Sequence, residues 1–195
     1  MPPTALQWLT GGRERSVLSL EGTALPRALM AADHRVVAID RDVEVVRALS
    51  THMLAVTAQA ESLPFDPCLF DVVICHQVFH RYAPGLVLSE MARVLAPGGH
   101  AAVSYLVRDD SVPWVRRLIA LVRQLDPDAM KGDFGADSVG ELEDSKYFPV
   151  VEHKEFRHWQ PIERDQLLAM VAGLDAVKGL DSAERSQLLD EVRAL

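Results

Sequence analysis

Along the chain, short continuous apolar runs alternate with segments whose apolar residues recur at helical spacing. A short apolar run between turn signals is typical of a strand, and continuous apolarity suits a strand buried on both faces of a sheet. The pattern predicts strands at residues 16–20, 35–39, 53–56, 70–75 and 101–107, with a sixth at 150–159. Most of these strands are separated by enough chain to hold a helix.

Helical periodicity fills most of the intervals between the strands. Helices are predicted at about 25–32, near 163–172 and near 182–194. Three further helices are predicted between them: one follows an N-cap at Asp42, one is a repeat of apolar residues that stops at 96–99, and one begins at Pro113. An Asp181-x-x-Glu184 capping box marks the start of the last helix. Residues 126–149 are polar and contain Pro, Gly and Asp, so we expect a loop or short helical turns there.

The alternation of strands and helices predicts an α/β fold with a mostly parallel sheet covered by helices on both faces. Neither an internal repeat nor a linker interrupts the pattern, so we expect a single domain over residues 1–195. Ligands of such sheets bind outside the carboxyl ends of the strands, near the point where the strand order reverses. The residues that directly follow each strand are therefore the first candidates for chemistry.

Composition narrows the class of protein. The chain has 195 residues and a net charge of −8, without a basic tract, which argues against nucleic acid as a partner. No apolar run approaches the length of a membrane span, and the N-terminus lacks the pattern of a signal peptide. Two cysteines are too few for a disulfide scaffold. We expect a cytoplasmic protein without a membrane partner.

Three features fall at predicted strand ends. The turn at residues 19–24, which contains Glu21, Gly22 and Thr23, joins the first strand to a helix whose N-terminus favours negative charge. Asp40 follows the second strand, where a carboxylate can accept hydrogen bonds from ribose hydroxyls. Residues 60–65 precede the fourth strand. Taken singly, the turn is compatible with a plain connector and Asp40 with a helix cap, but their order and spacing favour a ligand site.

The sequence resembles class I S-adenosylmethionine-dependent methyltransferases of the actinobacterial small-molecule type, from about residue 9 to 191. The most specific segments are RVVAID (35–40), AESLPF (60–65), FDVV (70–73) and EMARVLAPGG (90–99), with RDDSVPW (108–114) and FRHW (156–159) as signatures of one branch. The resemblance implies a Rossmann-like fold with strand order 3-2-1-4-5. It also implies that Asp40, beside Arg41, holds the ribose, that Ala60 and Glu61 border the adenine, and that residues 75–79, including His76, line the pocket beside the methionine part.

The loop after the first strand departs from the family pattern, which is an acidic residue followed by three spaced glycines. Ser19 stands at the acidic position, Glu21 at a glycine position and Ala24 at the last glycine, and the loop is one residue shorter. Side chains there obstruct the methionine part, because glycine permits positive φ and close backbone approach. A Glu21 charge near the cofactor carboxylate would cost about 1–4 kcal/mol. We expect weak or absent cofactor binding, with a dissociation constant above roughly 100 μM.

Two histidines follow the fourth strand. His76 and His80 have a spacing that suits a metal on a helix, but Gln77 follows His76 and the segment leaves a strand, so we expect no metal site. His80 is the candidate catalytic residue, because imidazole can accept a proton from a hydroxyl or amine near neutral pH. A structural role as a half-buried histidine stays open for His80.

Two hypotheses for the function remain. The first is an enzyme that transfers a methyl group to a small molecule, and the second is an inactive homologue that serves as an interaction or regulatory module. A nicotinamide-binding domain is a third, weaker alternative, which residues 60–65 and 96–99 disfavour. The resemblance also leads us to expect that the family's last antiparallel strand is missing and that little chain covers the cofactor. An open edge beyond the fifth strand then predicts a homo- or hetero-oligomer.

Overall fold

The computed structural model describes residues 1–22, 24–127 and 136–195. These residues group into two compact units, which are Met1–Leu106 with Phe134–His158, and Val107–Asp133 with Trp159–Leu195. The first unit contains the sheet and the second is helical. Each unit is described below by itself, and the expectation of one domain over residues 1–195 stays a prediction.

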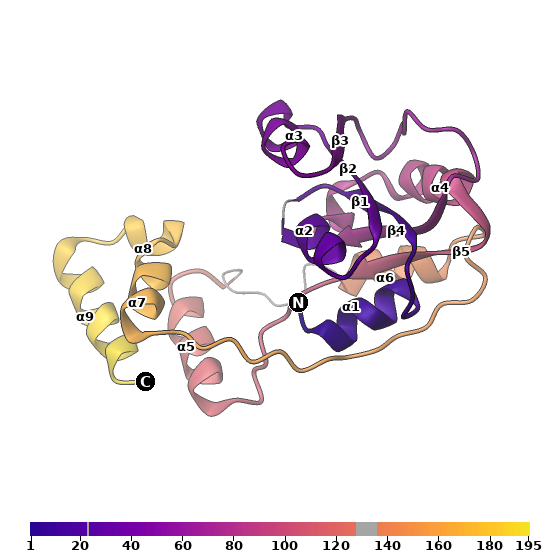
Figure 1. Cartoon of the computed structure of the whole chain (residues 1–195). Helices are drawn as coiled ribbons and strands as arrows, with labels where there is room; N and C mark the ends of the chain where they lie inside the picture. The colour runs from indigo at the N-terminus through magenta and orange to yellow at the C-terminus, as the bar shows by residue number, and fades with distance from the viewer. Residues whose placement is uncertain (23, 128–135) are drawn as a thin grey trace. The chain divides into compact units, whose positions relative to one another are not determined.

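The first unit is built on a parallel sheet with strand order β3-β2-β1-β4-β5 (Figure 1). Every pair of neighbouring strands described in it is parallel. The strands are β1 (Ser16–Leu20), β2 (Arg35–Asp40), β3 (Leu54–Thr57), β4 (Phe70–His76) and β5 (Leu95–Ser104). The predicted fold class is thus confirmed, since apolar runs marked the strands, and so is the order 3-2-1-4-5, which the resemblance implied.

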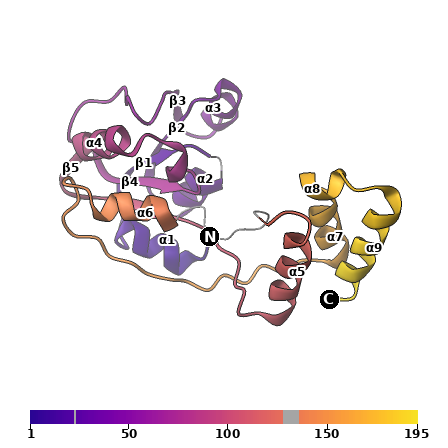
Figure 2. The same cartoon turned by 180° about the vertical axis from the view of Figure 1, so that it is seen from behind.

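Helices cover both faces of this sheet, which Figures 1 and 2 show from opposite sides. On one face, leucines of α1 (Pro3–Thr10) and α2 (Ala24–Ala31) pack against alternate residues of β1 and β4, such as Val17 and Ile74. On the other face, α4 (Pro84–Val94) and α6 (Ala136–Glu143) pack against the intervening residues, such as Leu18 and Val73. This strict alternation is the pattern of strands buried on both sides.

The second unit is a small helical cluster. It contains α5 (Pro113–Arg123), α7 (Arg164–Ala172), α8 (Asp175–Lys178) and α9 (Ser182–Arg193), which share a core that includes Val122, Val171 and Val192. The predicted capping box is present. The Asp181 carboxylate accepts a hydrogen bond from the Glu184 N–H, and the Glu184 carboxylate accepts one from the Asp181 N–H. Among the described helices of the whole chain, none is long and apolar enough to cross a membrane.

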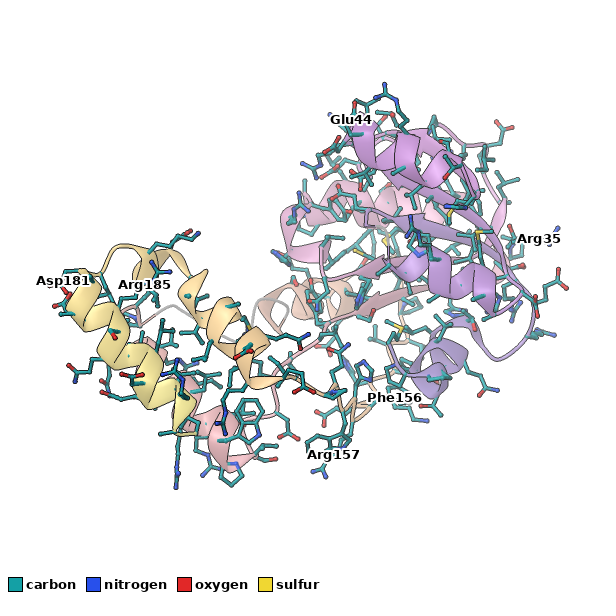
Figure 3. The ribbon with its side chains drawn as sticks, turned by 60° about the vertical axis from the view of Figure 1, so that its left-hand side comes forward. Arg35, Glu44, Phe156, Arg157, Asp181 and Arg185 are labelled. Atoms are coloured by element: carbon teal, nitrogen blue, oxygen red, sulfur yellow. The ribbon has the colours of Figure 1, made fainter. Side chains whose placement is uncertain are left out.

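The predicted sixth strand at 150–159 is wrong, since the structure has extended chain there but no strand. Phe156 instead packs on Trp8 of α1, with ring centroids 6.0 Å apart, and Figure 3 labels Phe156 in this segment. The four residues before it are all polar or charged and exposed, so they gain more from water than from a place in the sheet.

The other differences concern boundaries. β5 begins at Leu95, earlier than predicted, because residues 96–99 continue into the strand through an irregularity in its pairing with β4. Gly99 permits this close approach, since a Cβ there would lie 2.7 Å from the Asp71 carbonyl oxygen. In the polar region 126–149 the structure describes α6, while residues 128–135 lie outside the described part.

Candidate functional site

The carboxyl ends of β1, β2 and β4 lie side by side at the point where the strand order reverses. β1 pairs with β2 on one side and with β4 on the other, so Glu21, Asp40 and His76 come to one edge of the sheet. In Figure 3, Arg35 at the start of β2 and Glu44, just beyond its end, mark different edges of the unit. The edge on the Glu44 side is where parallel α/β sheets bind ligands.

Asp40 is joined to the loop after β1 through the backbone. Its side chain is buried, with one carboxylate oxygen accepting the Gly22 N–H at 3.1 Å and the other accepting the Asp42 N–H at 2.9 Å. The cap of α3 (Val43–Ser50) is Asp42, as predicted, so Asp40 is not a helix cap. Each carboxylate oxygen keeps a further lone pair for a ligand hydroxyl. Thr23, the third loop residue expected at the site, lies outside the described residues.

Glu21 occupies the glycine position with a left-handed backbone (φ 55°) and is only 4% exposed. Its Oε1 atom lies 3.0 Å from Nε and 2.9 Å from Nη2 of Arg41, and its Oε2 atom lies 3.1 Å from Nη1 of Arg81. Two guanidinium groups therefore offset its charge. The repulsion of a ligand carboxylate that the sequence suggested from Glu21 loses its basis, whereas the space that the side chain fills remains.

The floor of the site is apolar and contains two groups held in their neutral forms. Burial raises the pKa of the Cys75 thiol and of the Tyr82 hydroxyl well above their usual values, and the nearby Glu21 charge raises both further. The predicted buried state of Cys75 is confirmed, since its side chain is fully buried. Within the described part of the chain, the buried Ser19 hydroxyl has no hydrogen-bond partner. Ser19 is the residue at the family's acidic position.

The segment that contains Ala60 and Glu61 is pinned by two residues of α4. Glu90 accepts the Leu63 N–H at 2.7 Å, and the Arg93 guanidinium donates to the carbonyls of Leu63 at 2.9 Å and Phe65 at 2.7 Å. The Arg93 hydrogen bond lowers the pKa of Glu90, so this carboxylate stays ionised. The first and last residues of the EMAR motif (90–93) thus share one function, which is to hold the backbone of residues 63–65.

Within that pinned segment, Ala60 is buried, and the Glu61 carboxylate accepts the Ala83 N–H at 3.1 Å. The segment is thereby tied to the turn after β4 as well as to α4. The structure therefore brings the predicted residues Ala60 and Glu61 to the same edge as Asp40 and Glu21.

His76 ends β4 and is held by β5, since its Nδ1 atom lies 2.9 Å from the Ser104 hydroxyl. Burial lowers its pKa, so the neutral ring is favoured. Gln77 follows with φ 66°, which places left-handed non-glycine residues after both β1 and β4, the two strands at the reversal point. Sparsely populated backbone conformations of this kind cluster at functional sites.

His80 is exposed in the short turn after β4 (Phe79–Arg81) and lies against Tyr105. The His80 N–H donates to the Tyr105 hydroxyl at 3.1 Å, and the ring Nδ1 atom lies 3.5 Å from the same oxygen. That hydroxyl also lies 3.1 Å from the Ser138 Oγ atom. His80 and His76 thus contact different partners. Tyr105, Arg81 and Arg93 were not predicted at the site, because nothing in their local sequence points to these distant contacts.

A hollow lies along β5, away from the reversal point. It is a cavity of about 690 Å³ lined by β5, by residues of α1, α4 and α6, and by residues 147–154. In the described residues, no backbone hydrogen bond joins residues 147–154 to β5. The outer edge of β5 therefore borders a cavity instead of another strand.

Comparison with known proteins identifies the fold and its relatives. The pattern of a methyltransferase domain family matches residues 21–103. An uncharacterized methyltransferase of Mycobacterium bovis is 30% identical over 199 residues, covering 100% of this chain and 78% of the relative. An uncharacterized methyltransferase of Schizosaccharomyces pombe is 30% identical over 133 residues, covering 63% of this chain and 53% of the relative.

Two solved structures resemble the whole chain. One is a candidate methyltransferase from an antibiotic biosynthesis pathway of Anabaena variabilis, with a TM-score of 0.69 at 17% identity, covering 98% of this chain and 83% of the other. The second is a candidate type II methyltransferase of Anaeromyxobacter dehalogenans, with a TM-score of 0.64 at 20% identity, covering 99% and 87%. At these identities, the likeness establishes the fold.

Proposed function

Since the chain belongs to the class I S-adenosylmethionine-dependent methyltransferase family, we propose that it transfers a methyl group from this cofactor to a small-molecule acceptor. The observation that carries the proposal is the Asp40 carboxylate, buried at the reversal point and joined to the Gly22 N–H of the loop after β1. This arrangement presents a fixed acceptor at the place where α/β sheets bind nucleosides.

The residues present fit the nucleoside part of the cofactor. Asp40 would accept the ribose hydroxyls, beside Arg41, while Ala60 and Glu61 would border the adenine. His76 and its neighbours through Phe79 would line the pocket beside the methionine part. When bound, S-adenosylmethionine supplies an electrophilic methyl group on its sulfonium sulfur, and the chain's own task is to align the acceptor with it.

The methionine part fits less well, so we propose that the enzyme binds its cofactor weakly, whereas absent binding belongs to the inactive alternative. Glu21 fills a position where the family has glycine, and its left-handed backbone shows that glycine-like geometry is kept while the free space is lost. We expect a dissociation constant above roughly 100 μM for S-adenosylmethionine.

We assign to His80 the role of accepting the proton that the acceptor loses. Its ring is exposed in the turn after β4, and its Nδ1 atom lies 3.5 Å from the Tyr105 hydroxyl. Loss of a general base typically lowers kcat by about 10²–10⁴-fold. H80Q is therefore expected to reduce methyl transfer at saturating cofactor and to leave cofactor affinity unchanged. Equal activity of H80Q would remove this role.

The proposed site is tested by amide chemical-shift mapping with the demethylated product, S-adenosylhomocysteine, at millimolar concentration. Weak binding still reports its location in this experiment. We expect shifts at Gly22, Asp42 and Glu61, and their loss in D40N. Shifts confined to other regions, with these three amides unmoved, would contradict the assignment of the site.

The inactive interaction module is the alternative function, and one observation favours it. The ion pairs of Glu21 with Arg41 and Arg81 fill the loop from within. A complete absence of shifts with either S-adenosylmethionine or its product would support this alternative and exclude the enzyme.

We further propose that the protein associates with a second chain through the outer edge of β5. The cavity beside β5 and the absence of ladder bonds from residues 147–154, among the residues described, support this. Light scattering at micromolar concentration is expected to give a mass above the 21.6 kDa of one chain, and a clean monomer would exclude the association.

We also propose a cytoplasmic location, with which the two free cysteines are in keeping.

A further inference from the structure

The Glu21 carboxylate lies between two arginines that come from different strand ends. Arg41 follows β2 and contacts Oε1 through both Nε and Nη2, while Arg81 lies in the turn after β4 and contacts Oε2 through Nη1. Arg41 and Arg81 thus converge on one carboxylate at the reversal point. Two guanidinium groups converging on a carboxylate is the arrangement by which proteins bind small anions.

Burial within this cluster is unequal. The Glu21 side chain is 4% exposed, whereas those of Arg41 and Arg81 are 47% and 48% exposed. The anion is therefore the inner member of the cluster, and the two half-exposed guanidinium groups are its outer partners. One carboxylate and two guanidiniums leave a charge of +1. Glu61 adds some negative potential at Arg41, but its carboxylate is directed to the Ala83 N–H.

The backbone at Glu21 is held in a conformation that its side chain disfavours. Its φ of 55° lies in the left-handed region, which is unfavourable for a residue with a Cβ. The Glu21 N–H is also fixed, since it donates to the Ile39 carbonyl at 2.8 Å. The strained Glu21 residue thus places its carboxylate between the two arginines. A ligand carboxylate could occupy the same position.

We propose that Arg41 and Arg81 form a binding site for a small anion of the carboxylate class, and that Glu21 is an internal carboxylate occupying it. A ligand carboxylate binds these arginines only by displacing Glu21. For the adenosyl ligands used below, this inference rests on the proposed function, and it names the group that limits their affinity.

The first test uses inorganic sulfate as the probe, and it does not depend on any adenosyl ligand. Melting temperatures are measured for the wild type, E21Q and E21Q/R81Q, with sulfate exchanged for chloride at constant ionic strength. E44Q is the matched control, because Glu44 pairs with Arg47 on an exposed surface and its loss changes net charge equally. Sulfate is expected to stabilise E21Q more than the wild type or E44Q, and the gain is expected to disappear in E21Q/R81Q.

The second test compares two nucleosides by titration calorimetry. S-adenosylhomocysteine carries an amino-acid carboxylate, and 5′-methylthioadenosine lacks it. E21Q is expected to bind S-adenosylhomocysteine about tenfold or more tightly than the wild type does, since charge-assisted hydrogen bonds are gained. Its affinity for 5′-methylthioadenosine is expected to stay unchanged. E21G provides a second variant, in which the left-handed backbone is unstrained.

Each arm has an outcome that overturns the proposal. If sulfate stabilises E21Q no more than E44Q, the arginines do not form an anion site. An equal gain for both nucleosides in E21G, with no gain in E21Q, would mean that Glu21 acts by its volume and not by its charge. If neither nucleoside binds any variant while sulfate still distinguishes E21Q, the proposed cofactor is wrong and the anion site stands.

Discussion

Two buried acids lie at neighbouring strand ends, and they are held in different ways. Asp40, the last residue of β2, accepts two backbone N–H groups and is 7% exposed. Glu21, after β1, is 4% exposed but contacts the half-exposed side chains of Arg41 and Arg81. The first acid is bound into the backbone of both loops, whereas the second is held by groups that can turn to other partners.

This difference in partners predicts different consequences when each carboxylate is removed. Removing the Asp40 carboxylate leaves buried N–H groups without an acceptor, and such groups are costly. Removing the Glu21 carboxylate leaves guanidiniums that water can reach, which is much less costly. Asp40 thus stabilises the structure of the site, while our proposal for Glu21 is that it limits which ligands bind there.

The largest effect is expected from substituting Asp40. D40A removes the acceptor of the Gly22 and Asp42 N–H groups, and we expect about 2–4 kcal/mol less stability together with loss of cofactor-induced shifts. D40N keeps one oxygen acceptor and is expected to lose about half as much. Urea unfolding of both variants measures this, and an unchanged midpoint for D40A would show that water replaces the carboxylate.

Two arginines provide a matched comparison of backbone and side-chain partners. Arg93 donates to the Leu63 and Phe65 carbonyls, whereas Arg81 contacts Glu21. R93Q is expected to cost about 2 kcal/mol and R81Q less than about 1 kcal/mol in unfolding experiments. The reverse order would show that the Glu21 ion pairs, and not the bonds to residues 60–65, hold the site together.

A smaller effect is expected from pH. Burial lowers the folded-state pKa of His76 below the ordinary histidine value of 6.5, so the unfolded chain binds more protons in the window between the two pKa values. The stabilisation is fully present above pH 6.5 and is lost as the pH falls through the folded pKa. H76N is expected to flatten stability between neutral and mildly acidic pH.

His34 serves as the internal comparison for this prediction. Burial also lowers its pKa, but it accepts the Arg15 N–H at the opposite end of β2. H34N is therefore expected to flatten the same pH dependence without changing shifts induced by ligand. If H76N and wild type lose stability in parallel on acidification, burial of His76 does not couple folding to its protonation.

The sequence was sufficient to predict the sheet, because apolar runs mark the strands and those of the central strands β1 and β4 are buried on both faces. It failed at 150–159, where the apolar residues Val150, Val151 and Phe156 suggested a strand. There the intervening charged residues are exposed to water, and Phe156 packs on Trp8 instead of joining the sheet. A local pattern cannot report a competing partner that lies far away in the chain.

The candidate site was predictable to a similar extent. Asp40, Gly22 and Ala60 follow from strand ends and motif spacing, and the structure brings them to one edge of the sheet. The role of Arg81 was not predictable, because its partner Glu21 belongs to a different strand end and only the tertiary fold joins them. The same holds for the charge of Glu21, which Arg41 and Arg81 offset in the folded chain.

The central claim is that a site for S-adenosylmethionine exists at this edge and that Glu21 limits its affinity. The most direct measurement is calorimetric titration of the wild type and E21G with S-adenosylmethionine, under identical conditions. We predict a wild-type dissociation constant above roughly 100 μM and about tenfold or more tighter binding by E21G. Micromolar binding by the wild type, or no gain in E21G, would contradict the account.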